Sequence, residues 1–195
     1  MKLIFATHNE HKAQEVGSIL GIDNLEVATL SQVGYHEEIV EDGLTLEENA
    51  SIKSRTIYDK FGGNVFSEDT GLEVMALNME PGVHTARYAG EQKSAADNMN
   101  KLLFALEGTH DRTARFRTVV SLIWEGEEYL FEGIVNGRIA GSKSGTDGFG
   151  YDPIFIPFGY DKTFAELPAS VKNSISHRFR AMCQMQSFFK TLVTF

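Results

Sequence analysis

Short apolar runs alternate with stripes of helical period in the first part of the chain. Lys2–Ala6 is a largely apolar run, typical of a strand that is buried on both faces. From Lys12 the period becomes helical, and the predicted helix stops at Gly21. The apolar stripe of this helix consists of Ala13, Val16 and Leu20. Leu25–Leu30 alternates weakly and predicts a second strand.

The connection between the first strand and helix, Thr7–Lys12, is a candidate anion site. Free N–H groups and the positive dipole end at the start of a helix favour an anion. Thr7 and Asn9 add hydrogen-bonding side chains, and Lys12 adds a positive charge. The alternative interpretation is a helix cap with a solvated lysine beside it.

A second helix is predicted from Thr45 to about Phe61, because Thr45 and Glu48 form a capping box. Its inner face combines apolar and polar residues, namely Leu46, Asn49, Ala50, Lys53 and Ile57. An inward lysine is costly unless its ammonium group reaches an anion or water. Lys53 is therefore a candidate phosphate ligand, and an ordinary snorkelling lysine is the alternative.

Two adjacent carboxylates, Glu68 and Asp69, follow the β-rich run Asn64–Phe66. We expect the strand to end there and the chain to turn at Gly71, which would place both carboxylates at a strand exit. Mg²⁺ prefers oxygen ligands, and one or two carboxylates suffice when substrate phosphates supply the others. The alternative is an acidic turn that binds nothing.

The second half predicts two further helices and a long hairpin. Ser94 caps a helix whose core stripe consists of Met99, Leu102, Leu103 and Leu106. Thr113–Trp124 and Glu128–Ile139 are β-rich runs joined by a turn, with Arg115 and Arg117 on an exposed face. The last helix, capped by Ser176 or Ser174, has a core stripe of Met182, Met185, Phe189 and Leu192.

The segment 141–153 is rich in glycine and contains two aromatic residues. Glycines let a backbone approach a ligand closely, and Phe149 can stack on a planar base. The alternative is a surface loop that Phe149 and Tyr151 pin to the core.

His177 and Arg178 fall in the first turn of the last predicted helix. A positive charge at this end of a helix opposes the helix dipole, so we expect Arg178 to be placed there for a functional reason.

Composition limits the class of protein further. A chain of 195 residues forms one domain, or two lobes that share a core. No apolar run reaches the roughly 18–20 residues that span a membrane, and the N-terminus reads as a strand rather than a signal peptide, which predicts a cytoplasmic location. Cys183 is the one cysteine and is expected to be a core thiol in a helix. A net charge of −9 argues against broad nucleic-acid binding, so any phosphate ligand should be small.

Six separated segments together resemble the Ham1 family of inosine triphosphate pyrophosphatases, which act on non-standard purine nucleoside triphosphates. The matching segments are Thr7–Lys12, Glu48–Ala50 with Lys53, Glu68–Gly71, Ala86–Tyr88, Phe149–Pro153 and Ser176–Arg178. One segment alone would be weak, but six in the family's order make a chance match improbable.

The resemblance implies an elongated α/β fold of two lobes around a long mixed sheet with flanking helices, a cleft between the lobes, and a homodimer. It implies Mg²⁺-dependent cleavage of ITP, dITP and XTP to the monophosphate and pyrophosphate. Asp69 would be the metal ligand and general base, and Lys172 and Arg178 would face position 6 of the base. The implied substrate-binding residues are Thr7, Asn9, Lys12, Lys53, Thr70, Phe149, Gly150, Tyr151, Asp152, Lys172, His177 and Arg178.

Two positions depart from the family's usual pattern. Many bacterial members have Asp-Asp-Ser-Gly where this chain has Glu68–Gly71, and Val40 replaces a glutamate that the family often carries. The second metal ligand therefore stays open among Glu37, Glu38, Glu41 and Glu68. Because a carboxylate bound to Mg²⁺ is a poor base, Glu68 is an alternative for part of that task.

Two other functions compete with this one. A catalytically silent nucleotide sensor could use the same cationic loop and stacking phenylalanine, but the combination of Glu68, Asp69, Lys12 and Lys53 argues against it. A Maf-type pyrophosphatase would act on pyrimidine or modified nucleotides, and the segment Ser176–Arg178 argues against that substrate class.

Overall fold

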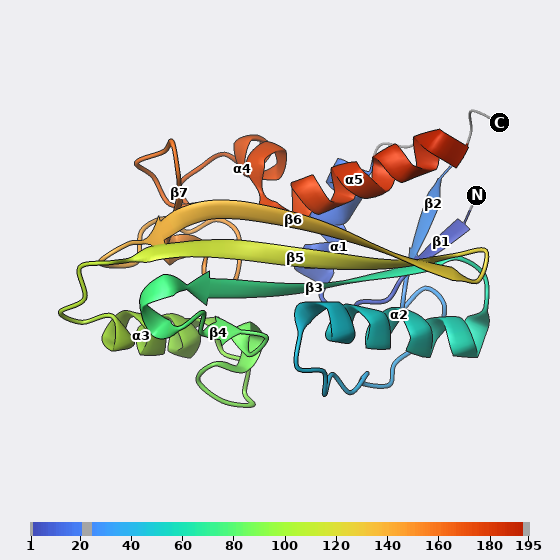
Figure 1. Cartoon of the computed structure of the whole chain (residues 1–195), viewed down its shortest axis with the longest axis horizontal. Helices are drawn as coiled ribbons and strands as arrows, with labels where there is room; N and C mark the ends of the chain where they lie inside the picture. The colour runs from blue at the N-terminus through green and yellow to red at the C-terminus, as the bar shows by residue number, and fades with distance from the viewer. Residues whose placement is uncertain (1, 21–24, 193–195) are drawn as a thin grey trace. The chain divides into compact units, whose positions relative to one another are not determined.

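The computed structural model describes residues 2–20 and 25–192 (Figure 1). Its strands are β1 (Lys2–Phe5), β2 (Glu26–Thr29), β3 (Val65–Val74), β4 (Pro81–Gly82), β5 (Thr113–Trp124), β6 (Glu127–Ile139) and β7 (Phe155–Pro157). Its α-helices are α1 (Glu10–Ile19), α2 (Leu46–Phe61), α3 (Ala95–Ala105), α4 (Ala169–Ile175) and α5 (His177–Leu192).

The strands form one mixed sheet in the order β2-β1-β3-β5-β6-β7, with β4 paired to β3. Strand β1 is parallel to both of its neighbours, β2 and β3, and its pairing places Ile4 beside Val65 and Phe5 beside Thr29. β4 and β7 pair in antiparallel fashion with β3 and β6. The predicted α/β class with a long mixed sheet is confirmed, whereas the elongated shape and the cleft stay predictions.

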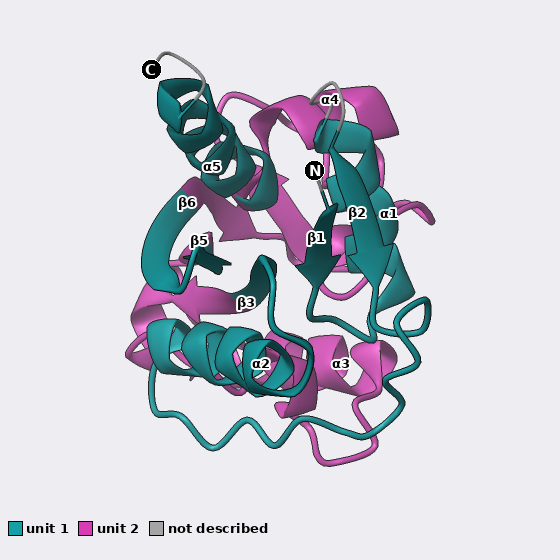
Figure 2. Ribbon diagram, turned by 90° about the vertical axis from the view of Figure 1, so that its right-hand side faces the viewer, with its two compact units in different colours: residues 1–69, 118–133, 178–195 teal, residues 70–117, 134–177 magenta. Residues whose placement is uncertain are grey.

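The chain groups into two compact units, coloured separately in Figure 2. Unit 1 comprises residues 1–69, 118–133 and 178–195, and unit 2 comprises residues 70–117 and 134–177. Strands β3, β5 and β6 each contribute residues to both units.

Unit 1 has a hydrophobic core on each side of β1. Leu3 and Phe5 belong to a cluster with residues of α1 and α5, such as Val16 and Met182. Ile4 belongs to a second cluster, which includes residues of α2. Successive side chains of a strand point to opposite faces, so the apolar run of β1 serves both clusters. Figure 1 shows the same arrangement, with α5 on one side of these strands and α2 on the other.

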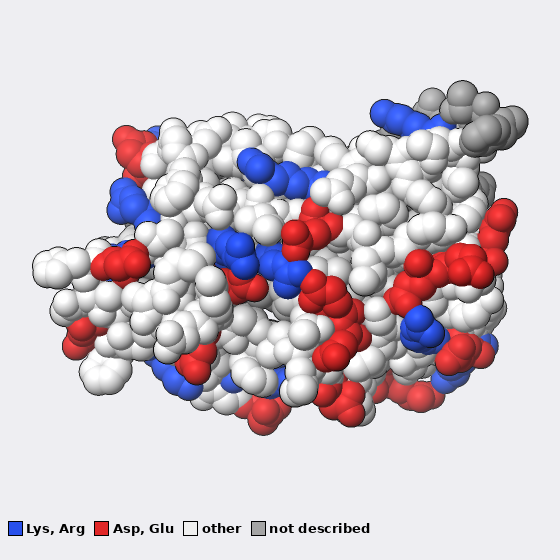
Figure 3. Space-filling view, in the orientation of Figure 1, with Lys and Arg blue, Asp and Glu red and all other residues white. Residues whose placement is uncertain are grey.

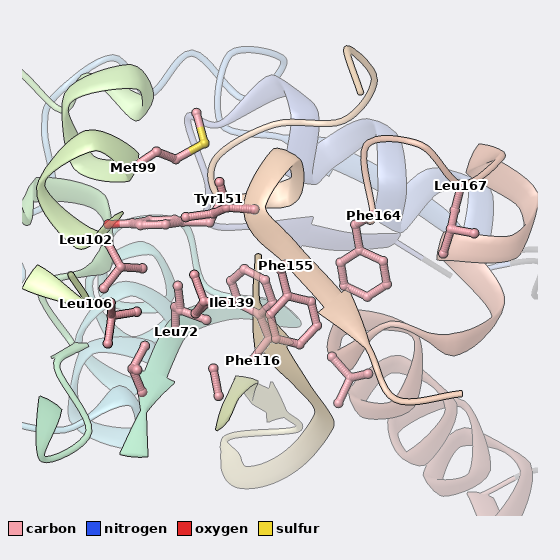
Figure 4. Close-up of a cluster of buried hydrophobic side chains, with 14 residues drawn as sticks. Leu72, Met99, Leu102, Leu106, Phe116, Ile139, Tyr151, Phe155, Phe164 and Leu167 are labelled. Carbon is pink, nitrogen blue, oxygen red and sulfur yellow. The ribbon is translucent and has the colours of Figure 1, made fainter. Parts of the chain in front are cut away.

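Unit 2 has a core of its own, which contains a group of packed aromatic rings. Phe116, Phe155 and Phe164 have ring centroids 4.7–6.4 Å apart, and Leu102 of α3 and Leu72 of β3 join the same cluster (Figure 4). The predicted Ser94 cap of α3 is confirmed, because the Ser94 side chain accepts from the Asp97 N–H.

Two predictions about local structure are wrong. The chain does not turn at Gly71: β3 continues to Val74, because Leu72 and Val74 extend its buried apolar pattern. Helix α1 begins at Glu10 rather than Lys12, because Asn9 caps it. The predicted stop at Gly21 lies outside the described residues.

Two side chains are more exposed than predicted, and two strands and one helix are absent from the predicted set. Leu192 is 40% exposed at the end of α5, and Cys183 is only partly buried. The elements missed are β4, β7 and α4, of which α4 follows Pro168 directly. Within the described residues, no helix is both long enough and apolar enough to cross a membrane.

A polar network joins α2 to the β5–β6 hairpin within unit 1. The Ser121 hydroxyl donates to the Glu128 carboxylate at 2.8 Å, and the buried Ser54 hydroxyl lies 2.7 Å from Ser121. Arg55 pairs with the same carboxylate. Partial burial of Glu128 opposes ionisation, but the bonds from Ser51, Ser121 and Arg55 outweigh it and lower the pKa of this carboxyl.

We predict that Glu128→Gln lowers the free energy of unfolding at neutral pH by about 1 kcal/mol. A lowered folded pKa means that this stabilisation is complete above the ordinary value of 4.5 and is lost as pH falls through the folded pKa. Thermal unfolding between roughly pH 6 and pH 3 should therefore depend less steeply on pH in the variant. The control is Glu127→Gln, an exposed neighbour on the same strand; an equal effect of both variants would contradict the prediction.

Candidate active site

Glu68 and Asp69 are consecutive residues in the middle of β3, so their side chains point to opposite faces of the sheet. Asp69 faces α2. The Lys53 ammonium donates to Asp69 Oδ1 at 2.9 Å, and the Asn49 amide lies 3.5 Å from Asp69 Oδ2. The predicted inward positions of Asn49 and Lys53 are confirmed, since both side chains are buried. The capping box of α2 is also present, which fixes where this face begins.

Glu41 is the other carboxylate on this side of the sheet. Its Oε2 atom lies 2.5 Å from Lys53 Nζ, so Glu41 and Asp69 share one ammonium group. Glu37 instead pairs with Lys60 at the surface, and Glu38 is exposed. Of the three candidates in the acidic segment, the structure brings Glu41 to Asp69.

This cluster changes the ionisation of its members. Burial would lower the pKa of Lys53, but Asp69 and Glu41 outweigh that effect and raise it, so the ammonium form is favoured. Burial raises the pKa of the Asp69 carboxyl, against the opposing effect of Lys53 and Lys12, and the nearby Glu41 charge adds to the rise. Both pKa values are raised because two carboxylates share one ammonium group in a site that is largely shielded from solvent.

The donor set on this face fits a magnesium ion. Asp69 and Glu41 supply two carboxylates, and Mg²⁺ usually takes its remaining ligands from water and substrate phosphates. Across residues 2–20 and 25–192 no group of three or more His, Cys, Asp or Glu side chains forms a complete metal cage.

Glu68 faces the other side, toward α1 and α5. Arg178 donates to both Glu68 oxygens, from Nε at 3.0 and 2.8 Å and from Nη2 at 2.8 Å. Lys12 Nζ lies 3.3 Å from Glu68 Oε1, and Arg178 Nη1 pairs with Glu15 of α1. Burial opposes ionisation of Arg178, but Glu68 and Glu15 outweigh it and raise the pKa of the guanidinium.

The start of α1 uses its polar side chains locally. Asn9 Oδ1 accepts from the Lys12 N–H at 3.1 Å, and Thr7 Oγ1 accepts from the Asn9 N–H at the same distance. The helix-cap alternative therefore describes Asn9 in this structure. Lys12 itself lies in the first turn of α1, where its ammonium reaches Glu68.

In unit 2 the glycine-rich loop is built around Asp152. Lys172 of α4 pairs with Asp152 Oδ2 at 2.6 Å, and the Phe149 N–H donates to the same oxygen at 2.8 Å. The Lys172 ammonium lies 4.8 Å from the centroid of the Phe149 ring. Asp152 and Lys172 are buried, so a hydrogen-bonded ion pair sits directly beside an aromatic ring.

The other predicted site residues of unit 2 are largely structural in their contacts. Tyr151 is buried and its hydroxyl donates to the Thr85 carbonyl, so it pins the loop to the core as the alternative interpretation supposed. His177 is buried and stacks on Phe116 at 4.7 Å. Thr70 is half-buried in β3, and Gly150 adopts a positive φ of 63° in the loop.

The structure thus brings the predicted residues together in two sets. Unit 1 holds Thr7, Asn9, Lys12, Lys53, Asp69 and Arg178, and unit 2 holds Thr70, Phe149, Gly150, Tyr151, Asp152, Lys172 and His177. Sequence reasoning missed Glu15, whose signal was its three-residue spacing from Lys12 on one helix. On the face shown in Figure 3, basic side chains lie beside acidic ones and do not form a continuous basic surface.

Comparison with known proteins assigns the family. A dITP/XTP pyrophosphatase of Flavobacterium johnsoniae is 51% identical over 185 residues, which cover 95% of this chain and 96% of that protein. A dITP/XTP pyrophosphatase of Porphyromonas gingivalis is 47% identical over 188 residues, or 96% of each chain.

Solved structures agree with the sequence relatives. The Ham1 protein of Staphylococcus aureus superposes with a TM-score of 0.89 at 40% identity, and that of Coxiella burnetii with 0.90 at 34%. Each comparison covers 98% of this chain and 99% of the other. Residues 3–188 match the Ham1 family as a whole, and with the order of motifs and the paired carboxylates of β3 in place, the chain belongs to the Ham1 family.

Proposed function

We propose that this protein hydrolyses the triphosphates of non-standard purine nucleosides, namely ITP, dITP and XTP, to the monophosphate and pyrophosphate. Relatives that are 42–51% identical over nearly the whole chain are named dITP/XTP pyrophosphatase. The observation that carries the proposal is the convergence of Asp69 and Glu41 on Lys53, because triphosphate chemistry needs carboxylates for a cation and an ammonium group for phosphate.

Asp69 and Glu41 would hold Mg²⁺, which when bound neutralises phosphate oxygens. Lys53 and Lys12 would neutralise the remaining negative charge of the triphosphate. Water would attack the α-phosphorus and give a proton to a carboxylate acting as general base, while the bond from the α-phosphorus to the bridging oxygen breaks and pyrophosphate leaves with that oxygen. Positioning and electrostatic stabilisation supply most of the catalysis in such reactions.

We assign the general base to Asp69 rather than Glu68, even though binding of Mg²⁺ would weaken Asp69 as a base, because the oxygens of Glu68 already have partners. Glu68 is fully buried and accepts three hydrogen bonds from Arg178, so its oxygens are committed on the other face of the sheet. Asp69 shares its cation with Glu41 and is the carboxylate that can exchange partners when a substrate arrives.

Unit 2 would bind the base. A 6-keto purine offers an acceptor at position 6 and an N1–H donor, whereas adenine offers a 6-amino donor and no N1 proton. Lys172 donates only and the Asp152 carboxylate accepts only, so this pair matches the 6-keto edge. Phe149 beside it would stack on any base. The role of Arg178 at position 6 of the base stays a prediction.

We also propose that the protein is a cytoplasmic homodimer, as the resemblance to the Ham1 family implies.

The decisive experiment is a nucleotide panel assayed for pyrophosphate release with and without Mg²⁺. We expect turnover of ITP, dITP and XTP to exceed that of ATP and dTTP, and to vanish when the metal is chelated. Asp69→Asn should lower kcat by more than about tenfold, a barrier increase above ~1.4 kcal/mol, because it removes a charge but keeps the shape.

Asp59→Asn on the exposed side of α2 is the matched control. Binding of ITP without pyrophosphate release would identify a sensor instead, and faster turnover of pyrimidine or modified nucleotides would identify a Maf-type enzyme. A variant Asp69→Asn with wild-type kcat would remove Asp69 from both of its roles.

A second prediction separates the candidate metal ligands. Glu41→Gln should raise the Mg²⁺ concentration for half-maximal activity by about tenfold or more, since a hard cation loses one charged oxygen ligand. Glu37→Gln is the control, because Glu37 also pairs with a lysine but does so at the surface. A metal titration that shifts equally in both variants, or in neither, would mean that Glu41 does not hold the ion.

A third prediction concerns the proposed base site. A Cβ atom at Gly148 would lie 2.1 Å from Asp152 Oδ2, and Gly148 has a φ of +77°, so Gly148→Ala must displace this carboxylate. We expect kcat/KM for ITP to fall by about tenfold, because base contacts set specificity through such paired polar groups. Gly141→Ala is the control, because an added Cβ there would meet nothing within 4 Å beyond its chain neighbours, and it should leave kcat/KM unchanged. If kcat/KM for ITP is the same in Gly148→Ala as in the wild-type protein, Asp152 does not take part in recognition of the base.

A further inference from the structure

Four charged side chains on the α1 side of β3 form an alternating chain. Lys12 contacts Glu68, Glu68 holds Arg178, and Arg178 holds Glu15. Helix α1 supplies both ends, because Lys12 and Glu15 are three residues apart and project from the same side of the helix. β3 and α5 supply the two central groups.

The members of this chain differ in how firmly they are held. The side chains of Glu68 and Arg178 are 0% and 1% exposed, whereas those of Glu15 and Lys12 are 14% and 17% exposed. The Lys12 to Glu68 distance of 3.3 Å exceeds the 2.8–3.0 Å of the Arg178 to Glu68 bonds. Lys12 is therefore the most weakly held of the four, and Arg178 competes with it for the same oxygen, Glu68 Oε1.

Glu15 limits that competition. A guanidinium group is planar with donors in a fixed fork, so a partner on Nη1 fixes the orientation in which Nε and Nη2 meet Glu68. With Glu15 present, two cations share two carboxylates. Without it, Arg178 would lose the carboxylate that holds Nη1, and the buried guanidinium would turn more fully toward Glu68, the carboxylate it shares with Lys12.

We propose that Glu15 is a positioning residue for triphosphate binding, which acts through Arg178 and Glu68 to hold the Lys12 ammonium in place. This inference rests on the proposed function insofar as Lys12 is a phosphate ligand. Glu15 itself touches no reacting atom. Preorganised side chains of this kind improve binding by reducing the cost of ordering the ligand-contacting group.

The sign of the effect distinguishes this role from simple electrostatics. Removing a negative charge near an anion site should, by Coulomb attraction alone, tighten triphosphate binding. If Glu15 positions Lys12, its removal should weaken binding instead. A purely structural role would lower the thermal stability without a specific dependence on Lys12.

The test is a double-mutant cycle on the full-length protein, read out as the calorimetric affinity for inorganic triphosphate. Glu15→Ala should weaken binding by about fivefold or more in the wild-type background, and should have almost no effect in the Lys12→Ala background, since coupled residues are not additive. Glu10→Ala, in the first turn of the same helix, is the matched control and should leave affinity unchanged. Glu15→Gln keeps the acceptor but loses the charge; it should give an intermediate loss, and it replaces Glu15→Ala in the cycle if the alanine variant does not fold.

Additive effects of Glu15 and Lys12, or tighter binding in either Glu15 variant, would overturn the inference. So would a failure of the wild-type protein to bind triphosphate at all. Pyrophosphate release from the nucleotide panel is measured separately, so a protein that binds triphosphate through this chain but releases no pyrophosphate would contradict the proposed function and leave the role of Glu15 supported.

Discussion

The alternation of side chains along β3 is the constraint on which the charged centre of unit 1 depends. Because consecutive residues of a strand point to opposite faces, Glu68 and Asp69 cannot act as one bidentate pair. Each carboxylate meets its own cation: Arg178 on the side of α5 and Lys53 on the side of α2. The charges are therefore separated by the thickness of a sheet, and each side can be given a different task.

Burial makes this separation demanding. An isolated charge in a protein interior is costly, and removing one partner of a buried pair leaves the other uncompensated. The structure meets this requirement with shared partners: Lys53 lies between two carboxylates, and Glu68 lies between two cations. Because each of these groups has two partners, one of its two ion pairs on each face is the weaker. A substrate can replace that weaker ion pair while the buried group keeps its other partner.

Local rules predicted most of the helices and strands in advance. The capping box at Thr45, the Ser94 cap and the hairpin runs all depend on neighbours in sequence, and the structure has them as predicted. The prediction of a turn at Gly71 is wrong. A glycine that follows two acidic residues is typical of a turn, but the buried apolar residues Leu72 and Val74 extend the strand beyond it.

Contacts between distant segments could not be predicted in the same way. Glu15 and Arg178 are separated by 163 positions, and nothing near either residue indicates that they meet. The choice of Glu41 over Glu37 and Glu38 depends likewise on where the acidic segment passes α2, which its composition does not specify. Family resemblance supplied the candidates, and the tertiary contacts distinguish among them.

The interleaving of the two units along the chain has a consequence for biosynthesis. Unit 1 is assembled from three separate stretches of sequence, and the last of them, from residue 178, contains α5 except for its first residue, His177. Arg178, Met182 and Met185 are thus synthesised after all of unit 2, although they complete the core and the ion pairs of strands made near the beginning. During translation Leu3, Phe5 and Glu68 therefore lack these partners until α5 has left the ribosome. A truncation that removes α5 should leave an apolar surface and the carboxylate of Glu68 uncovered, so the product should be degraded by quality-control proteases rather than fold as a smaller protein.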